Sequence, residues 1–279
     1  MSAKLHTNAE LRLRIYSALV LILLTLCLTY LGARTFAILI IVMSSLMAWE
    51  WGRVVRGTGT DAVSVVQVAA IAAAGVMTLY RYPLLAFGTI MLATLAAFWL
   101  HKLLRFRADA WWSAAGVYYA GFPAIALIAI RADLQYGFIA TVYLFIVVWC
   151  ADSGAYFAGR LIGGPRLAPS ISPNKTWAGL FGGAVTASLA GAAFAMWFEE
   201  TSTVALAFVS LSLAIISQIG DLGESAIKRI FGVKHSSDMI PGHGGVLDRL
   251  DGLVFAAVGA GLIAVAVDPL NPGRALLVW

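Results

Sequence analysis

The stretch YGFIATVYLFIVVWCADSGAYFA, residues 136–158, decides the fold of this chain. As a helix it is long enough to cross a hydrocarbon core about 30 Å thick, which takes roughly 20 residues. Backbone N–H and C=O groups must be paired inside lipid, so we expect a helix here. Its one charged residue, Asp152, is notable because a carboxylate at membrane depth is costly unless it is paired or lines a wet cavity.

Other stretches of the chain share this character. Apolar residues make up 61% of the sequence and charged residues only 12%, with a mean hydropathy of +0.88. A soluble domain needs more charge to cover its surface. We therefore predict an all-α, polytopic integral membrane helical bundle of about nine transmembrane helices, and the further segments are Ile15–Leu31, Thr35–Trp51, Ala62–Tyr80, Leu84–Leu100, Trp112–Ile130, Trp177–Phe198, Val204–Ile219 and Gly252–Val267.

The distribution of basic residues predicts the orientation of these segments. Fifteen of the 19 Lys and Arg residues fall on one side of a nine-span topology, and the other side has Arg34, Arg81, Arg131 and Arg274. Cytoplasmic loops carry the excess of Lys and Arg, so the N-terminus should be cytoplasmic and the C-terminus outside. We expect a bacterial-type inner (cytoplasmic) membrane. Residues 4–31 resemble a signal peptide but lack a convincing cleavage site, so we expect a retained first span.

Charge and cysteine usage exclude other classes of protein. A net charge of +5 could indicate nucleic-acid binding. The basic residues, however, lie in short loops between apolar segments and form no basic stripe, so nucleic-acid binding is not expected. Cys27 and Cys150 both lie in apolar runs, so neither a disulfide framework nor a CxxC metal site is available.

The domain organisation follows from where the polar motifs lie. We expect a single membrane domain over residues 1–279, in which residues 1–135 are spans with little motif content and residues 136–279 form a catalytic half. Two loops of that half, 159–176 and 220–251, are long, rich in Gly, Pro and charge, and on the predicted cytoplasmic side. Loops of this kind are usually kept to build a site.

The segment Ser172-Pro173-Asn174-Lys175-Thr176-Trp177 opens the seventh predicted helix. Pro173 and Asn174 are expected to form a turn and Thr176 to cap the helix. Lys175 would then lie near a helix N-terminus, where free N–H groups favour a phosphate. The alternative is that Lys175 is an interfacial anchor. For Asp152, the alternative is a buried residue hydrogen-bonded to neighbouring helices.

Two further patterns lie close to the C-terminal end. Asp221, Glu224, Ser225 and Lys228 have i, i+3, i+4 and i+7 spacing, so on a helix they form one polar stripe. The run Pro241-Gly242-His243-Gly244-Gly245 follows, and its glycines would let the backbone approach a ligand closely. Taken singly, the stripe is compatible with a solvated surface helix and the glycines with a flexible turn.

Acidic and basic residues occur together in these motifs, which raises a question of charge. Carboxylates repel phosphates, whereas a hard divalent cation such as Mg²⁺ binds one or two carboxylates together with phosphate oxygens. Lys and Arg would hold the remaining anionic oxygens. This combination is typical of phosphoryl or nucleotidyl transfer. Neither a Walker P-loop nor a kinase glycine loop is present in the sequence.

At this point the residues closely resemble the phosphatidate cytidylyltransferase (CDP-diacylglycerol synthase) family. The signature of that family is matched in register, and the matching residues are Ser225, Lys228-Arg229, Lys234, Pro241 to Gly245, Asp248-Arg249 and Asp251. Preceding motifs also resemble the family, namely Gln218, Gly220-Asp221, Glu224, Asp152 with Ala155-Tyr156, and Ser172 to Trp177 with Gly179. The resemblance covers about Trp149 to Gly252.

The resemblance implies that phosphatidic acid attacks the α-phosphorus of CTP in the membrane, with pyrophosphate leaving. It assigns Asp221 and Asp248 as Mg²⁺ ligands with Asp251 and Glu224 in support, and leaves open whether a second cation binds. Phosphates would be held by Lys175, Lys228, Arg229, Lys234 and Arg249. Substrate contacts are further expected from Ser172, Asn174, Thr176, Ser225, Gly244 and Gly245. His243 would donate to the departing pyrophosphate, and Asp152 would orient a basic residue or join the metal site.

Two positions depart from the family pattern. The family usually has Asp directly after the signature Lys, but here Lys234 is followed by His235 and an acid arrives only at Asp238. Ala178 stands where the family often has Glu. If the missing Asp binds metal or cytidine, the departure lowers activity unless Asp238 substitutes for it.

Two alternatives remain at the level of sequence. A CTP-dependent lipid kinase of the polyprenol or phytol type also uses CTP at a membrane, but it releases CDP. A secondary transporter would use Asp152 and Glu50 as coupling sites, and inverted repeats would be its signature. The chain shows no internal repeat. A homodimer is compatible with such folds, and no nucleic-acid partner is expected.

Overall fold

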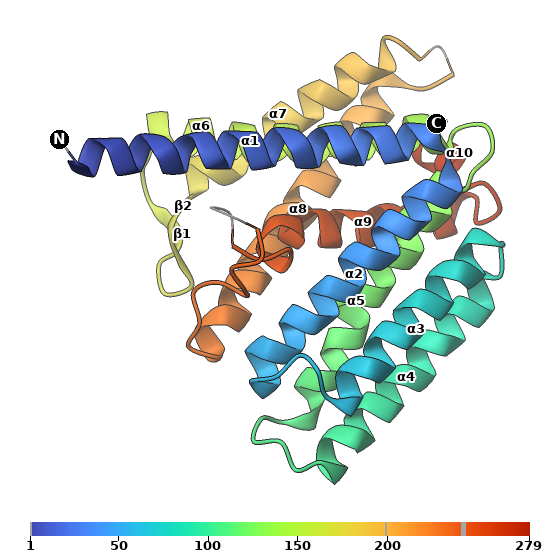
Figure 1. Ribbon diagram of the computed structural model, residues 1–279. Coiled ribbons are helices and arrows are strands. Elements are labelled where there is room, and N and C mark those ends of the chain that lie inside the picture. Colours follow the sequence, from blue (N-terminus) through green and yellow to red (C-terminus); the bar gives the residue numbers. More distant parts are fainter. Residues whose placement is uncertain (1, 199, 241–243) are drawn as a thin grey trace. The chain divides into compact units, whose positions relative to one another are not determined.

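The computed structural model describes residues 2–198, 200–240 and 244–279. Within these ranges the chain forms ten α-helices and one two-stranded sheet (Figure 1). In chain order the elements are α1 (Ser2–Leu31), α2 (Ala33–Arg56), α3 (Ala62–Leu79), α4 (Pro83–Leu103), α5 (Ala110–Arg131), α6 (Gly137–Leu161), β1 (Arg166–Ala168), β2 (Ser172–Thr176), α7 (Trp177–Ala195), α8 (Thr203–Ile230), α9 (Leu247–Val267) and α10 (Pro272–Leu277).

The described residues include eight helices, α2 to α9, that are long and apolar enough to cross a membrane. They coincide with the last eight predicted segments, which confirms an all-α polytopic membrane protein. The first predicted segment falls on α1, where the apolar stretch Tyr16–Leu31 is shorter than the others. A spanning role for α1, the total of nine and the orientation stay predictions.

The chain packs into two compact units, and neither is continuous in sequence. The first unit consists of Met1–Ile128 and Phe231–Leu250, and the second consists of Ala129–Ile230 and Asp251–Trp279. The segment between α8 and α9 therefore packs with the N-terminal helices, although α8 itself belongs to the second unit. The signature residues from Lys234 to Arg249 thus belong to the unit that contains the N-terminal helices, where the sequence shows few motifs.

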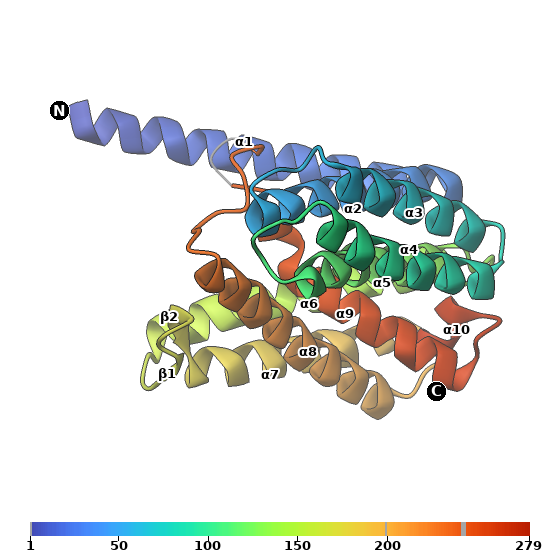
Figure 2. The same cartoon turned by 90° about the horizontal axis from the view of Figure 1, so that it is seen from below.

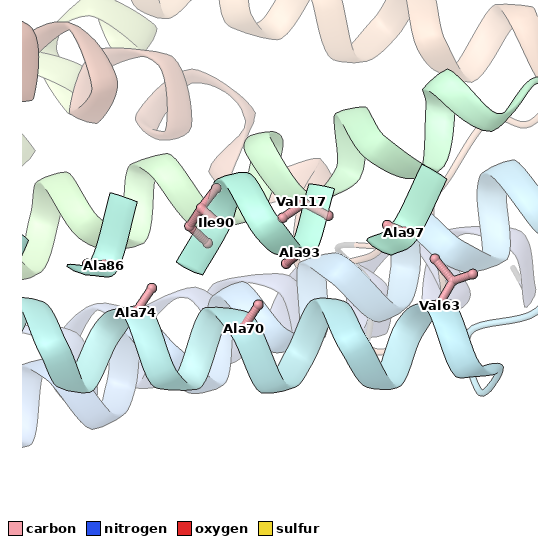
Figure 3. Close-up of a cluster of buried hydrophobic side chains, with 8 residues drawn as sticks. All are labelled: Val63, Ala70, Ala74, Ala86, Ile90, Ala93, Ala97 and Val117. Carbon is pink, nitrogen blue, oxygen red and sulfur yellow. The ribbon is translucent and has the colours of Figure 1, made fainter. Parts of the chain in front are cut away.

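Small residues bring the helices of the first unit close together. α3 and α4 are neighbours in that unit. The buried cluster here is mostly alanine and also includes one residue of α5 (Figure 3); it consists of Val63, Ala70, Ala74, Ala86, Ile90, Ala93, Ala97 and Val117. Small side chains let helix backbones approach closely, which is how transmembrane helices associate where lipid is as apolar as the core.

A buried polar network joins the ends of α2 to α5 in the same unit. The Arg56 side chain is fully buried, and its Nε lies 2.8 Å from Oδ2 of Asp61. Arg56 also donates to the hydroxyls of Ser64 and Ser113. Nδ1 of His101 lies 2.7 Å from the same Ser113 hydroxyl. A buried charge must be paired, so this network fixes the arrangement of the four helix ends.

In the second unit, α6 packs on α7 and α7 on α8 (Figure 2). Glycines allow the first of these contacts. A Cβ added at Gly182 of α7 would lie 2.2 Å from Cβ of Ala158, and one at Gly154 of α6 would lie 2.3 Å from the Thr186 hydroxyl. Both glycines are therefore required for the approach of the two backbones. This contact sets the distance between Asp152 and the start of α7.

A β-hairpin connects α6 to α7, where we expected a turn at Pro173 and Asn174. Both residues instead lie inside β2, which pairs antiparallel with β1, and the turn comes earlier, at residues 169–171. The prediction of a turn was wrong because Pro, which has no backbone N–H, is also accepted at an edge-strand position that donates no hydrogen bond to a neighbouring strand. Both strands of a two-stranded sheet are edge strands. The predicted cap is confirmed: the Thr176 hydroxyl accepts a hydrogen bond from the Gly179 N–H at 3.1 Å.

The second long loop is also shorter than expected. We predicted a loop over 220–251, but residues 220–230 continue α8 as helix. The polar stripe from Asp221 to Lys228 is thus helical, as its spacing indicated. The connecting segment is residues 231–246, and we refer to its described residues, 231–240 and 244–246, as the signature loop.

Asp133 organises the second unit at the start of α6. Its Oδ1 accepts hydrogen bonds from the N–H groups of Gln135 and Tyr136, at 3.0 and 2.9 Å. Its Oδ2 accepts from the N–H groups of Gly273 and Arg274, both at 3.1 Å. One buried carboxylate therefore satisfies free N–H groups at the start of α6 and of α10.

Candidate functional site

Lys175 and Asp221 form an ion pair in the second unit. Nζ of Lys175 lies 2.6 Å from Oδ2 of Asp221, and both side chains are partly exposed. Lys175 is held in place because it precedes Thr176, which caps α7. Asp221 lies on α8, about two and a half turns before its end at Ile230. The pair therefore joins the hairpin to α8, and Lys175 is more than an interfacial anchor.

Two other carboxylates of the second unit belong to the same group. Asp152 and Asp251 both interact electrostatically with Asp221 and with Lys175. The Asp152 side chain has exposed surface, and Asp251 is half-buried. We call these four residues the Asp–Lys cluster. Three carboxylates against one ammonium leave an excess of negative charge in one place.

The rest of the α8 stripe forms a second ion pair. Nζ of Lys228 lies 2.7 Å from Oε2 of Glu224, whose side chain is almost fully buried. One position further on, Nε of Arg229 donates to the Ile171 carbonyl at 3.3 Å, which ties the end of α8 to the hairpin turn. Gln218, which matches the family motif, donates to the Leu180 carbonyl of α7 at 3.3 Å.

Asp248 organises the signature loop in the first unit. Its Oδ2 accepts hydrogen bonds from the N–H and hydroxyl of Ser236, at 3.1 and 3.2 Å, and from the N–H of Gly245, at 3.0 Å. Nδ1 of His235 lies 3.8 Å from the same oxygen. Gly244 has a φ of +84°, which a side chain would strain. The assignment of Asp248 as a metal ligand stays a prediction, and the structure shows that its carboxylate also accepts hydrogen bonds that hold the loop.

Glu50 is the main residue that sequence reasoning missed. It lies in α2, is fully buried and contacts the signature loop within the first unit. Its Oε1 accepts from the Ser237 hydroxyl at 2.5 Å and the Val246 N–H at 2.9 Å. Its Oε2 accepts from the Leu247 N–H at 2.7 Å and the Ser236 hydroxyl at 3.0 Å. The available signal was an acid inside an apolar span, which we considered only as a transporter coupling site.

The other predicted residues lie as follows. Ser172 is half-buried in β2, and Asn174 in the same strand is exposed. Ser225 is half-buried on α8, whereas Lys234 in the signature loop and Arg249 on α9 are exposed. His243 lies outside the described residues, together with Pro241 and Gly242, so its predicted role stays a prediction.

The described residues contain no group of three or more His, Cys, Asp or Glu side chains arranged to hold a metal ion without other ligands. Mg²⁺ does not need such a cage, because it typically takes one or two carboxylates, several waters and the phosphates of a substrate. The oxygen-rich, negatively charged Asp–Lys cluster has the donor chemistry that suits a hard cation of this kind.

Together these features define a class of protein: a helical membrane enzyme that gathers acidic and basic side chains for a phosphate-bearing substrate. Comparison with known families narrows the class. The family model described as the cytidylyltransferase family matches residues 12–266, and the chain belongs to that family.

Individual relatives agree with this membership. The chain is 40% identical over 250 residues to a protein of Brucella suis named phosphatidate cytidylyltransferase, a match that covers 89% of this chain and 91% of the relative. Proteins of the same name from Haemophilus influenzae and Bacillus subtilis are 46% and 42% identical over 129 and 138 residues, which is about half of each chain. These names give no support to the lipid-kinase or transporter alternatives.

Proposed function

We propose that this protein is a phosphatidate cytidylyltransferase, which converts CTP and phosphatidic acid into CDP-diacylglycerol and pyrophosphate. The observation that supports this function best is the Lys175–Asp221 pair inside the Asp–Lys cluster, in a chain of the cytidylyltransferase family. Relatives that match most of this chain carry the name of that activity.

In the proposed reaction, an oxygen of the phosphatidic acid phosphate attacks the α-phosphorus of CTP. A new P–O–P bond forms, the bond from the α-phosphorus to the bridging oxygen of the β-phosphate breaks, and pyrophosphate leaves. The attacking phosphate is already an anion, so a strong general base is not needed. The main difficulty is repulsion, because two polyanions must be held in line.

Basic side chains of this chain would hold those anions. Lys175 lies beside the N-terminus of α7, where the helix dipole adds to its attraction for phosphate. Lys228 and Arg229 lie at the end of α8, and Lys234 and Arg249 would contact phosphates from the signature loop and α9. Fixed charges of this kind stabilise the developing charge of a transition state without reorganisation. Ser172, Asn174, Thr176, Ser225, Gly244 and Gly245 remain the proposed further contacts of the substrates.

We also propose that Mg²⁺ binds at the acidic residues, because three carboxylates and one ammonium leave negative charge to be offset. Within the Asp–Lys cluster, Asp221 would hold the ion with support from Asp251, and Asp152 would orient Lys175 or join the site. Asp248 as a second ligand and Glu224 in support stay what the family resemblance implies. The ion would supply Lewis-acid neutralisation of the phosphate oxygens. His243 stays the proposed donor to pyrophosphate.

Phosphatidic acid is a bilayer lipid and CTP is water-soluble, so the two must meet at a membrane boundary. We infer that this boundary is the cytoplasmic face of a bacterial inner membrane, since most basic residues lie on one predicted side. The lipid would enter laterally and CTP from the cytoplasm.

One assay tests the function directly. Purified protein in mixed micelles is incubated with phosphatidic acid and CTP labelled at its α-phosphate, with and without Mg²⁺. We expect label in CDP-diacylglycerol, equimolar pyrophosphate and no product without the metal. Asp221→Asn should abolish turnover, whereas Asp109→Asn, which removes an exposed carboxylate elsewhere, should leave it normal. In a parallel reaction with a polyprenol in place of phosphatidic acid, release of CDP together with a phosphorylated polyprenol would instead identify a lipid kinase.

A further inference from the structure

Glu50 is a fully buried carboxylate, and its hydrogen-bond donors among the described residues come from the signature loop and the first residue of α9. Four groups donate to its two oxygens: the hydroxyls of Ser236 and Ser237 and the N–H groups of Val246 and Leu247. Each oxygen accepts two of these bonds. A buried ionised carboxylate is stable only when it is satisfied in this way, so the loop and Glu50 depend on each other.

Two of the donors belong to the start of α9. The first N–H groups of a helix have no partner within the helix, and a negative charge there is favoured by the helix dipole. Glu50 therefore serves as the cap of α9, although it comes from α2, 196 and 197 residues away along the chain. Asp248 lies in the first turn of that helix, so a defined start of α9 also defines where Asp248 lies.

Gly245 is matched to this arrangement. A Cβ added at Gly245 would lie 1.9 Å from the Ser236 hydroxyl and 2.6 Å from Oε1 of Glu50. The loop backbone can approach the carboxylate only because no side chain is present at this position. We had expected the glycines to admit a ligand, and for Gly245 the structure shows close packing against Glu50.

We propose that Glu50 is a positioning residue of the enzyme: it holds the signature loop and the start of α9, and through them it fixes Asp248. Its effect on turnover rests on the function proposed above. The Ser236 hydroxyl lies 3.0 Å from a Glu50 oxygen and 3.2 Å from an Asp248 oxygen, so its single proton is shared between the two carboxylates and this hydroxyl bridges them. Glu50 itself would not contact substrate.

The substitution Glu50→Gln tests the proposal because it keeps the size of the side chain but turns one acceptor oxygen into an NH₂ group that faces two donors. We expect kcat to fall about 10- to 100-fold, the loss typical of residues that orient a metal or catalytic site. Hydrogen exchange measured by mass spectrometry should rise in peptides covering 244–247 and stay unchanged in α3 and α4.

Asp61→Asn is the matched control. Asp61 is also a carboxylate of the first unit, and it pairs with Arg56 and caps α3 without contacting the signature loop. It should lower thermal stability but leave kcat and exchange at 244–247 unchanged. If Glu50→Gln cannot be purified, Ser237→Ala removes one donor and should raise exchange at 244–247 to a smaller extent.

Three results would overturn the proposal: turnover of Glu50→Gln within about two-fold of the wild type, lost turnover without faster exchange at 244–247, or faster exchange spread over α3 and α4. The exchange experiment does not depend on activity. A wild-type protein that makes no CDP-diacylglycerol would therefore remove the proposed function and leave the structural role of Glu50 to be judged separately.

Discussion

Nζ of Lys175 lies 2.6 Å from Oδ2 of Asp221, and this ion pair joins the β-hairpin to α8. Asp152 and Asp251 also interact electrostatically with Lys175. Among the described residues, it is the only basic partner identified for these two carboxylates. It therefore has two tasks, since it offsets the carboxylates and is placed to attract a phosphate.

Replacing Lys175 tests whether its charge both offsets the neighbouring carboxylates and attracts a phosphate. Lys175→Met keeps the length of the side chain but removes the charge, so the three carboxylates repel each other and phosphate binding weakens. We expect kcat/KM for CTP to fall at least about 100-fold, a loss of about 2.7 kcal/mol of transition-state stabilisation. Lys102→Met, which removes a basic residue stacked on Phe98 and Trp99, is the control and should stay near the wild type. An unimpaired Lys175→Met would remove this residue from the proposed site.

The contact between α6 and α7 should tolerate no extra methyl group at Gly182. An added Cβ would lie 2.2 Å from Cβ of Ala158, so Gly182→Ala should push the helices apart and destabilise the protein by about 1–3 kcal/mol. The double variant Gly182→Ala/Ala158→Gly moves the methyl group to the other helix and should recover much of the loss. Thermal unfolding in detergent measures both, and equal melting temperatures of the single and double variants would contradict the packing argument.

Asp133 should matter for stability and not for chemistry. In Asp133→Asn, an NH₂ group replaces an oxygen that accepts two backbone N–H groups, which leaves donors facing each other. The expected cost is about 1–3 kcal/mol for each buried group left unsatisfied. The melting temperature should fall, whereas kcat of the remaining folded protein should be normal. Asp268→Asn, at a carboxylate that accepts from Leu270 and Asn271 in an exposed turn, is the control and should change the melting temperature little.

Most of the fold could be predicted from the sequence because it depends on local composition. Apolar stretches of the right length locate α2 to α9, and Thr176 marks the start of α7 through its capping hydroxyl. The strand at 172–176 could not be predicted in this way. Its five residues include Pro, Asn and Lys, which are all depleted in strands, and it forms a strand because β1 is there to pair with it.

In the candidate site, too, the residues with a local sequence signal could be predicted and the residue with distant partners could not. Charged residues in apolar surroundings pointed to Asp152 and Asp221, whose partner Lys175 was also found from its motif. The role of Glu50 was missed, because its partners are 186 to 197 residues away and are two serines and two backbone N–H groups. Neither group has a local sequence pattern, so only the fold shows that Glu50 has four donors.

The orientation in the membrane can be tested with a single cysteine in the signature loop. Ser236 and Ser237 are buried and hydrogen-bonded to Glu50, so the exposed Asp238 is the better position. In a background without Cys27 and Cys150, Asp238→Cys should resist a membrane-impermeant thiol reagent in intact cells and react after the cells are opened. A cysteine at Leu134, which is 93% exposed and on the predicted outer side, should react in intact cells. The opposite pattern would reverse the orientation.

The departure at position 235 leads to a further prediction. At position 235 the family resemblance leads us to expect Asp, but this chain has His. The imidazole of His235 is half exposed, and its Nδ1 lies 3.8 Å from Oδ2 of Asp248. His235→Asp would place a second carboxylate beside Asp248, and additional ligand charge strengthens the binding of hard cations. We expect the Mg²⁺ concentration for half-maximal turnover to fall several-fold. His235→Asn, which adds no charge, should not lower it. An unchanged or higher Mg²⁺ requirement in His235→Asp would show that this side of Asp248 does not face the metal, and would leave Asp221 as the principal proposed ligand.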